Sequence, residues 1–386
     1  MDISNIINEL GEDRELYFNA VAPPIWQASN FAFKTVEDFS KIAEDERQAY
    51  VYSRGINPTT DILRKKLAAL DHAEDCLLFS SGAAAIFAGV FANVKAGDHI
   101  VSVKNPYSSA KKMFDAILPR FGVTVSYIDG KTIEEWENAR QNNTVLFYLE
   151  SPNSWTYELQ PLAQIAQLAK KHNIVTFIDN TYCTPIYQNV IDIGIDIAMQ
   201  TATKYIGGHS DTLGGVLCGS NAMMKKIFDT ELMTIGSSLQ PFNGWLLLRG
   251  LRTLPLRLER IHQTTQRIIS FLDQHPAIEK IIFPFHPSFE QYELAKKQMK
   301  AALGLVTIIL KKYDRSSIIH FCESLRHFLM AVSWGGHESL VIPRCTFIPE
   351  QDYNPDNEYH RHIRLYCGLE EPEYLIQDLE QALKTI

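Results

Sequence analysis

Residues 200–211 read QTATKYIGGHSD, and they form the most informative stretch of the sequence. The apolar residues 193–199 precede it and predict a buried strand, after which Lys204 stands among small and hydroxyl-bearing residues. Burial at a strand end favours the neutral amine of a lysine, which is its nucleophilic form. Thr201 and Thr203 offer hydroxyl groups to a phosphate. A lysine taken alone is usually a solvated loop residue, so this interpretation requires a second group.

A carboxylate upstream supplies that second group. Asp179 follows another apolar run, residues 174–178, and is itself followed by Asn180 and Thr181. A lysine that forms a Schiff base and an acidic partner for a pyridinium nitrogen are the two protein groups that pyridoxal phosphate (PLP) chemistry requires. Lys204 and Asp179 together therefore favour PLP as the cofactor.

The composition is that of a soluble globular protein. The chain has 386 residues, 46% of them hydrophobic and 21% charged, and this length suggests two domains. The net charge of -8 and the pI near 5.9 argue against a nucleic-acid binder. The first residues, MDISN, lack the features of a signal peptide, and no apolar stretch is long enough to span a bilayer. Six scattered cysteines without a CxxC pair indicate core thiols in a reducing compartment. We expect a cytoplasmic protein without a metal site.

Strand-like and helix-like segments alternate in the first two thirds of the chain. Asn57 and Pro58 begin a helix as its N-cap and first residue. The following segments are strands at 76–79, 99–103, 123–128, 145–149, 174–178 and 193–199, with helices at 83–93, 108–121 and 161–172. This alternation predicts a mostly parallel sheet covered by helices on both faces. Ligands bind such sheets at the carboxyl ends of the strands, where Asp179 and Lys204 fall.

The pattern divides the chain into three parts. Residues 1–50 have weak periodicity and predict an extended arm that packs on something else. Residues 51–245 form the alternating large domain. Residues 246–386 predict a smaller α+β domain, which begins with one long helix over 246–270.

Three weaker candidates fit a planar, phosphate-bearing cofactor. Gly82 and Ala83 join a strand to a helix, and small residues there let backbone N–H groups approach a phosphate. Tyr107 follows a strand and could stack on a ring. Tyr52 and Arg54 precede the first core helix with groups suited to phosphate. Each of the three also has a purely structural interpretation, as a tight turn, a packing tyrosine and a surface pair.

Several motifs occur in the order typical of one family. They are Tyr52-Ser53-Arg54 with Asn57-Pro58-Thr59, Ser81-Gly82, Glu150-Ser151-Pro152, Asp179-Asn180-Thr181, Ala202-Thr203-Lys204-Tyr205 with Gly208-His209-Ser210-Asp211, Gly335-Gly336-His337-Glu338-Ser339-Leu340, and Arg364-Leu365 with Gly368-Leu369-Glu370. On these residues the chain resembles the Cys/Met-metabolism (transsulfuration) branch of fold-type I PLP enzymes, from about residue 15 onward. The resemblance implies an α/β fold with a large PLP-binding domain and a smaller α+β C-terminal domain.

The resemblance also implies roles around the cofactor. Lys204 matches the Schiff-base lysine that shuttles protons, and Asp179 matches the carboxylate on the pyridine nitrogen. Tyr107 matches the ring-stacking tyrosine and is a second candidate for proton transfer. The phosphate-binding positions are matched by Gly82, Ala83, Thr201 and Thr203.

Other matched positions concern the partner subunit and the substrate. Tyr52 and Arg54 match residues that reach the phosphate of a neighbouring subunit. The resemblance therefore implies that residues 1–50 contact that subunit and that the enzyme is a homo-oligomer, with a dimer of dimers expected. Arg364 matches the arginine that holds the α-carboxylate of a small sulfur amino acid, assisted by the backbone around Ser333.

Departures from the family pattern bear on the reaction. Ser154, Trp334 and the segment Gly82-Ala83-Ala84-Ala85 resemble bacterial cystathionine β-lyases. The usual asparagine has moved one place, to Asn153, which leaves its role open. The cysteine typical of methionine γ-lyases is absent near residue 109. The sequence therefore favours β-elimination of cystathionine to homocysteine, pyruvate and ammonia, with Trp334 narrowing the substrate pocket.

Other functions stay open at this point. A cystathionine γ-synthase or a γ-lyase, including a methionine γ-lyase-like enzyme, would share the same cofactor residues. A nucleotide-dependent enzyme on a parallel sheet is disfavoured because neither GxGxxG nor a Walker loop occurs. A regulator that binds the cofactor without catalysis would not need Lys204, Asp179, Tyr107 and Arg364 together.

Overall fold

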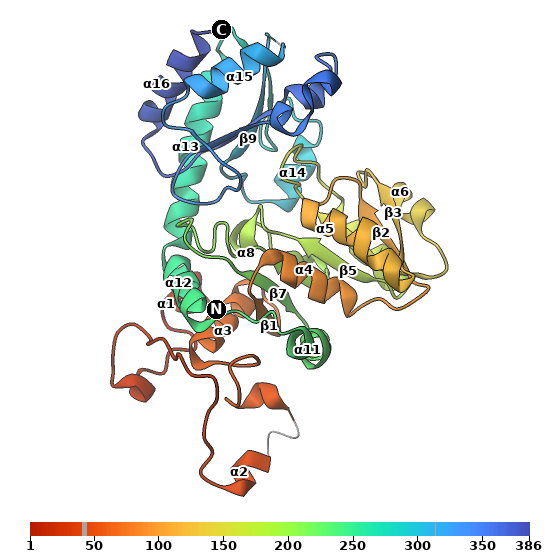
Figure 1. Cartoon of the computed structure of the whole chain (residues 1–386), viewed down its shortest axis with the longest axis vertical. Coiled ribbons are helices and arrows are strands. Elements are labelled where there is room, and N and C mark those ends of the chain that lie inside the picture. Colours follow the sequence, from red (N-terminus) through yellow and green to blue (C-terminus); the bar gives the residue numbers. More distant parts are fainter. Residues whose placement is uncertain (41–44, 313) are drawn as a thin grey trace. The chain divides into compact units, whose positions relative to one another are not determined.

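The computed structural model describes residues 1–40, 45–312 and 314–386. Its elements follow one another along the chain as Figure 1 shows. The chain forms two compact units. The N-terminal unit comprises residues 1–151, 160–207 and 211–252, and the C-terminal unit comprises 152–159, 208–210 and 253–386. The division falls after residue 252, close to the position after residue 245 at which the sequence pattern changes.

A seven-stranded sheet forms the centre of the N-terminal unit. Its strands are β1 (Asp75–Phe79), β2 (His99–Val103), β3 (Thr124–Ile128), β4 (Thr144–Glu150), β5 (Val175–Asp179), β6 (Ile197–Gln200) and β7 (Gly215–Gly219). Their order is β1-β7-β6-β5-β4-β2-β3. Strand β7 runs antiparallel to both of its neighbours, and the pairs from β6 to β3 are all parallel. The prediction of a mostly parallel sheet is confirmed.

The sheet topology brings several strand ends to one edge. Glu150 pairs with Asp179, and Asp179 pairs with Met199, so β4, β5 and β6 end side by side. Strand β1 points the same way as β6 because both are antiparallel to β7. The residues that directly follow β1, β4, β5 and β6 therefore share the carboxyl edge of the sheet.

Side chains that cap the N-terminus mark the start of several helices of the N-terminal unit. Asn57 caps α3, since its side chain accepts a hydrogen bond from the Thr59 N–H, a contact typically worth about 1 kcal/mol. Ser81 caps α4 by accepting from the Ala84 N–H. The helices are α1 (Ile3–Asn8), α2 (Val36–Ser40), α3 (Pro58–Leu70), α4 (Gly82–Phe91), α5 (Ser108–Lys112), α6 (Ile133–Ala139), α7 (Leu162–Lys171), α8 (Thr184–Tyr187), α9 (Val190–Ile193), α10 (Asn221–Ile227), α11 (Met233–Ile235) and α12 (Pro241–Arg252).

Two predicted segments differ in the structure. The strand expected over 193–199 begins only at Ile197, because α9 precedes it and ends at Gly194 with a positive φ of 106°. The long helix expected over 246–270 is two helices, α12 and α13 (Leu254–Asp273), that meet at Thr253. Pro255 lies in the first turn of α13 and has no N–H to donate back to α12, which accounts for the break.

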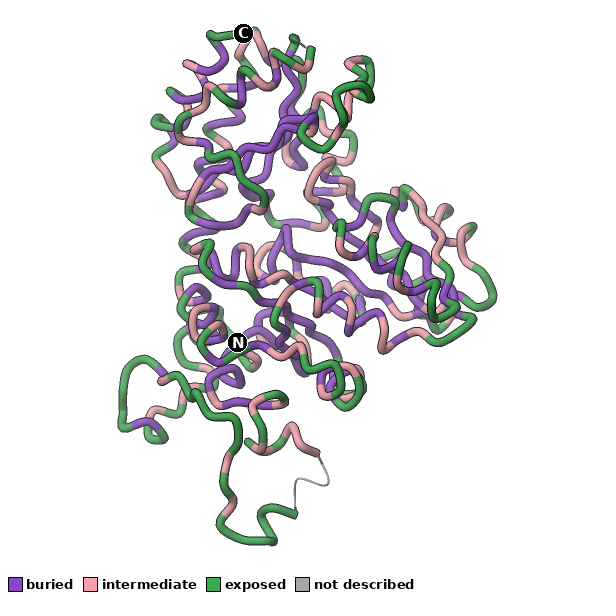
Figure 2. Tube along the Cα trace, in the orientation of Figure 1, coloured by how far each residue is buried: buried purple, intermediate pink, exposed green. Residues whose placement is uncertain are grey.

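The arm at residues 1–50 has a packed start and an exposed continuation. Lys66 of α3 is fully buried and donates to the carbonyl oxygens of Ile6 and Ile7 at 2.9 and 3.1 Å. Glu12 lies 3.0 Å from Lys66 and 2.9 Å from Arg252. Farther along, large apolar side chains lie open to solvent, and the long stretch of exposed residues is plain in Figure 2. They include Leu16, Phe18, Val21, Val36 and Phe39. Packing of this segment on a neighbouring subunit stays a prediction.

A five-stranded sheet forms the centre of the C-terminal unit. Its strands are β8 (Ile278–Ile282), β9 (Leu305–Leu310), β10 (Leu329–Met330), β11 (Leu340–Pro343) and β12 (Ile363–Tyr366), in the order β10-β11-β12-β9-β8. The helices are α13, α14 (Tyr292–Gln298), α15 (Arg315–Ser324) and α16 (Pro372–Leu383). Strand β9 is buried along its whole length, and β12 pairs with it on one side and with β11 on the other.

The cysteines and the helices bear on two further expectations. All six cysteines are buried free thiols, which confirms them as core residues. Burial raises the pKa of the Cys183 thiol well above its usual value. In the parts of the chain that the structure describes, no helix combines the length and the apolar character that a membrane span requires.

Candidate active site

Asp179 lies at the end of β5, and hydrogen bonds reach only one of its two carboxylate oxygens among the described residues. Both the N–H and the hydroxyl of Thr181 donate to Oδ1, the N–H at 2.9 Å. The other oxygen, Oδ2, accepts no hydrogen bond from any residue that the structure describes. Burial raises the pKa of Asp179, while the Thr181 donors and the charge of Lys204 act in the opposite direction. A cationic N–H donor beside Oδ2 would keep this buried carboxylate charged.

Lys204 stands four residues beyond the end of β6, the neighbour of β5. Its backbone N–H donates to the carbonyl of Thr201 at 3.1 Å, which closes a turn and keeps the lysine at the carboxyl edge of the sheet. Lys204 lies close enough to Asp179 for its charge to lower the pKa of that carboxyl. The structure thus brings together the lysine and the carboxylate that the sequence paired.

Gly82 and Thr201 form a close-packed turn at the start of α4. A Cβ atom on Gly82 would lie 2.1 Å from Thr201 Oγ1, so only glycine fits there. Thr181 connects this turn to Asp179, because its hydroxyl also accepts from the Thr201 N–H at 2.8 Å. Gly82 and Ala83 occupy the first turn of the helix, where backbone N–H groups have no partner within the helix. Helix α4 therefore presents free donors beside a hydroxyl group, as an anion site requires.

Thr203 is held through its side chain, whereas Tyr107 is held through its backbone. The Thr203 hydroxyl lies 3.1 Å from the Gly214 N–H, from which it accepts, and so holds the loop before β7. Tyr107 is 42% exposed, and its N–H donates to Glu150 Oε2 at 2.6 Å. Glu150 ends β4 beside Asp179, so this bond fixes the Tyr107 backbone at the same edge of the sheet. The Tyr107 ring is left available for contacts.

Tyr52 and Arg54 contact each other at the surface of the chain. Both side chains are exposed, and the Arg54 guanidinium carbon stands 5.3 Å from the centre of the Tyr52 ring. No hydrogen bond or ion pair in the described parts of the chain joins either residue to Gly82, Thr201 or Asp179. Their predicted contact with a phosphate of a neighbouring subunit stays a prediction.

Arg364 is the prominent group of the C-terminal unit. It lies within β12, only 6% exposed, opposite Thr307 of β9 and Ile342 of β11. Its guanidinium donates to two backbone carbonyls, those of Ser154 at 3.0 Å and Ser333 at 3.3 Å. Burial lowers the pKa of Arg364 to about 10. A buried guanidinium bound only to neutral carbonyls is well suited to a ligand carboxylate, which would restore the balance of charge.

The residues around Arg364 act through their backbones. Ser154 and Ser333 contribute carbonyl oxygens rather than hydroxyl groups. Ser333 has a φ of 85°, unusual for a residue other than glycine, and this conformation accompanies the turn of its carbonyl toward Arg364. Trp334 is 8% exposed. Its predicted contact with substrate stays a prediction.

Asn153, whose role the sequence left open, organises the loop that carries Ser154. Its side-chain oxygen accepts from the N–H groups of Trp155, Thr156 and Tyr157 at 2.9, 2.8 and 3.2 Å. Its amide group donates to Glu158 Oε2 at 2.9 Å. Sequence reasoning missed this function, along with the bridging role of Thr181 and the contact of Glu150 with Tyr107. An asparagine followed by three polar or aromatic residues was the available signal.

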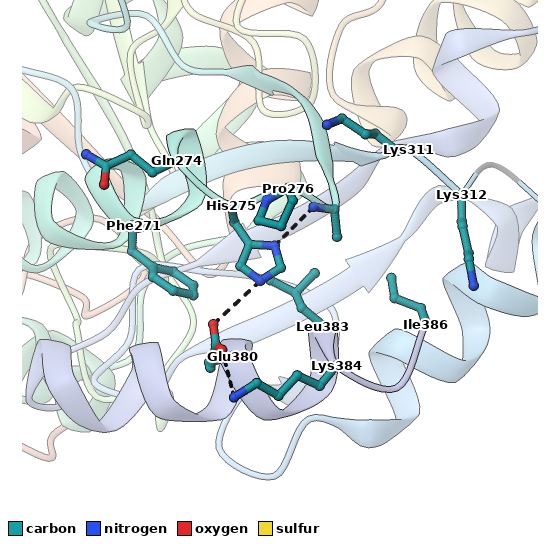
Figure 3. A pocket seen from close by; sticks show the side chains of 11 residues that line it. Phe271, Gln274, His275, Pro276, Lys311, Lys312, Glu380, Leu383, Lys384 and Ile386 are labelled. Atoms are coloured by element: carbon teal, nitrogen blue, oxygen red, sulfur yellow. Dashed lines mark hydrogen bonds and ion pairs between the residues drawn. The ribbon is translucent and has the colours of Figure 1, made fainter.

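A surface pocket of the C-terminal unit contains none of the predicted site residues. It has a volume of about 780 Å³ and lies between the end of α13, the residues after β9 and the end of α16 (Figure 3). Glu380 lies 3.5 Å from the His275 ring and 2.8 Å from Lys384 Nζ. The Lys384 ammonium lowers the pKa of Glu380. These ion pairs account for the charged groups on that side of the pocket.

N–H groups at a helix start, a buried carboxylate and a lysine at adjoining strand ends are typical of fold-type I PLP enzymes, and this chain is an enzyme of that class. The family model described as Cys/Met metabolism PLP-dependent enzyme matches residues 5–384, so the chain belongs to that family. Its cofactor is pyridoxal phosphate. The open Oδ2 of Asp179 and the free donors of α4 fit the ring nitrogen and the phosphate of this group.

Individual relatives extend over nearly the whole chain. An L-methionine gamma-lyase of Treponema denticola is 36% identical over 96% of this chain and 94% of its own length. A cystathionine gamma-lyase of Bacillus subtilis (strain 168) is 33% identical over 95% of this chain and 95% of its own. The crystal structure of cystathionine gamma-lyase from Lactobacillus plantarum complexed with L-serine has a TM-score of 0.91 and 32% identity, and covers 100% of this chain and 99% of that chain. This chain is a PLP-dependent lyase of the transsulfuration type.

Proposed function

We propose that this protein acts mainly by γ-elimination on a sulfur amino acid, releasing a thiol, 2-oxobutyrate and ammonia with the uptake of one water. The observation that carries the proposal is the similarity to proteins named methionine and cystathionine gamma-lyases over about 95% of the chain. Tyr107 supports it from the structure, because its ring stays available at the edge of the sheet that carries Lys204.

The chain's own residues supply binding and proton transfer. Asp179 would hold the ring nitrogen of PLP, and Gly82, Ala83 and Thr201 would hold its phosphate. Bound PLP supplies an electron sink for the electron pair left when a proton leaves the substrate Cα. Arg364 would hold the substrate carboxylate, which orients the Cα–H bond. The Lys204 amine would accept the Cα proton and return it later.

γ-Elimination needs one more proton transfer than β-elimination does. The leaving sulfur is bonded to Cγ, so a proton must also leave Cβ before the carbon–sulfur bond breaks. Lys204 and Tyr107 are the two groups of the site that can carry these protons. The Glu150 carboxylate fixes the Tyr107 backbone and keeps this second group in place.

β-Elimination of cystathionine is the second candidate. Ser154, Trp334 and the segment 82–85 favour it in the sequence, and none of the observed contacts opposes it. The loop with Ser154 contributes only its backbone to Arg364, so this residue type does not by itself decide between the two eliminations.

The keto acid released from cystathionine tests the proposal. We expect the holoenzyme to release mainly 2-oxobutyrate and cysteine, measured by chromatography of the keto-acid derivatives together with a thiol assay. Enzyme denatured before mixing serves as the control for non-enzymatic release. Mainly pyruvate and homocysteine would establish β-elimination instead. Formation of cystathionine from cysteine and an activated homoserine, faster than any elimination, would indicate a γ-synthase.

We also infer that the functional unit is at least a dimer, with a tetramer built as two dimers expected. Tyr52 and Arg54 support this, because both are exposed and neither contacts the phosphate cradle of its own chain. The exposed apolar side chains of the arm, Phe18 among them, supply surface that association would bury. Sedimentation of the holoenzyme tests the inference, and a fully active monomer at assay concentration would contradict it.

Replacing Arg54 with alanine is expected to weaken the retention of PLP. A charge-assisted contact to phosphate is worth roughly 1.5–3 kcal/mol, so the dissociation constant should rise about tenfold to a hundredfold. Loss of visible cofactor absorbance during dialysis measures it. Lys34→Ala, which removes another exposed cation of the arm, is the matched control. Equal retention in the two variants would show that Arg54 does not contact the phosphate.

A further inference from the structure

Two guanidinium groups of the C-terminal unit share one aromatic ring. The Arg364 guanidinium carbon lies 4.7 Å from the centre of the Trp155 ring, and that of Arg344 lies 5.2 Å from it. Arg344 also stands 4.4 Å from the Tyr359 ring and 5.7 Å from the Phe347 ring. Aromatic faces attract cations and fix their positions without neutralising them. Two positive charges therefore lie beside the same ring.

Arg364 lies within β12 of the small sheet, and Arg344 begins the 3-10 helix that directly follows β11. Arg364 of β12 pairs with Ile342 of β11, and Arg344 follows Ile342 by two residues. The Arg344 N–H donates to the His362 carbonyl at 2.7 Å, which continues the ladder beyond β11.

Neither guanidinium has an anionic partner in the parts of the chain that the structure describes. Arg364 donates to carbonyls only, and Arg344 Nε is buried without a hydrogen bond. Glu158, the carboxylate of the Trp155 loop, is engaged by Asn153 and Thr156 at 2.9 Å each. Two guanidinium groups beside one ring repel each other, because both carry a positive charge. Two anionic groups of a ligand would remove this repulsion.

We propose that Arg344, held by Trp155 and Tyr359, binds a second carboxylate at the far end of the substrate side chain while Arg364 holds the α-carboxylate. The inference rests on the proposed function and assigns its substrate class. The substrate is an amino acid with carboxylates at both ends, such as cystathionine or an acidic ester of homoserine, rather than methionine.

The upper limit on the distance between the two guanidinium groups admits such a molecule. The two guanidinium carbons cannot be farther apart than the sum of their distances to the Trp155 ring, 4.7 and 5.2 Å. This limit corresponds to roughly three extended residues of polypeptide at about 3.3–3.6 Å each. Cystathionine carries its carboxylates at the two ends of a chain of similar length. Methionine ends in a methyl group and offers Arg344 no anion.

Kinetics of Arg344→Met on paired substrates test the proposal. The ratio of kcat/KM for cystathionine to that for methionine is expected to fall at least about tenfold, because charge-assisted hydrogen bonds to one carboxylate are lost. Arg344→Lys keeps the charge but not the planar fork and should give an intermediate ratio. Arg326→Met, which removes an exposed arginine of the same unit, should leave the ratio unchanged. An unchanged ratio in Arg344→Met, or an equal loss for both substrates, would overturn the proposal.

A second pair of substrates identifies the source of the distal carboxylate. O-succinylhomoserine carries it and O-acetylhomoserine does not. If Arg344→Met changes the kcat/KM ratio of cystathionine to methionine more, the substrate is a thioether. If it changes the ratio of O-succinylhomoserine to O-acetylhomoserine more, the substrate is an acidic homoserine ester. If Arg344→Met lowers kcat/KM equally for the acidic and the neutral substrate of both pairs, Arg344 does not bind a distal carboxylate.

Binding without turnover separates this inference from the proposed function. Suberate has as many chain atoms between its carboxylates as cystathionine, and octanoate has the same length with one carboxylate. Calorimetric titration of the holoenzyme should show tighter binding of suberate, and Arg344→Met should remove that preference. If no substrate yields a keto acid, the proposed function fails while this titration still decides the subsite. Equal affinity of the wild-type holoenzyme for suberate and octanoate would disprove the binding of a second carboxylate by Arg344.

Discussion

Replacement of Lys204 by alanine is expected to abolish turnover while the fold persists. We propose that the lysine accepts and returns the Cα proton, and loss of such a group typically costs 10²–10⁴-fold in rate. Loss of the covalent link to the cofactor should add to this effect. Lys204 lies after β6 at the carboxyl edge of the sheet, within the electrostatic reach of Asp179. Release of keto acid from cystathionine and the visible absorbance of the holoenzyme measure the outcome.

The control for this experiment is Lys95→Ala, which removes an exposed lysine of the same unit. It should retain wild-type turnover and absorbance. Circular dichroism and thermal unfolding establish that both variants fold. A Lys204→Ala protein that turns over at the wild-type rate would exclude Lys204 as the proton carrier.

Replacement of Arg364 by methionine should have the second largest effect. Removing one partner of a buried, hydrogen-bonded charge pair costs about 2–5 kcal/mol, which lowers kcat/KM roughly thirtyfold to several thousandfold. The loss should fall on every amino-acid substrate alike, since all carry the α-carboxylate. Cofactor content should stay at the wild-type level, because Arg364 lies in the C-terminal unit and Asp179 and Thr201 in the other.

Arg326→Met again serves as the control for the loss of one positive charge in that unit. A drop in kcat/KM confined to cystathionine would mean that Arg364, rather than Arg344, binds the distal carboxylate. Unchanged kinetics in Arg364→Met would exclude it from substrate binding altogether.

Much of the large sheet could be predicted because its signal is local. Apolar runs of four to seven residues that alternate with segments of helical periodicity predict parallel strands. The runs that end at Asp179 and Gln200 are of this kind. Strand β7 was missed, since it begins and ends with glycine and has only three apolar residues between them. The break between α12 and α13 was also missed, although Pro255 was the signal for it.

The candidate site was predictable to the extent that its residues end strands. Asp179 and Lys204 came together because parallel strands end at one edge. The contact of Trp155 with Arg364 joins residues more than 200 positions apart in the sequence, and no periodicity or spacing predicts such a contact. The role of Asn153 depends on three N–H groups that converge only after its loop has folded. Single residues whose meaning depends on tertiary packing were the ones that the sequence left open.

The division of the chain into two units has a consequence for how such enzymes diversify. The residues that we assign to the cofactor belong to the N-terminal unit, and those that we assign to the substrate, Arg344 and Arg364 among them, belong to the C-terminal unit. Substitutions in one unit can therefore alter which amino acid is accepted without disturbing the groups that retain PLP. Selection can explore new substrates at the small sheet while the large sheet preserves the chemistry that all of them share.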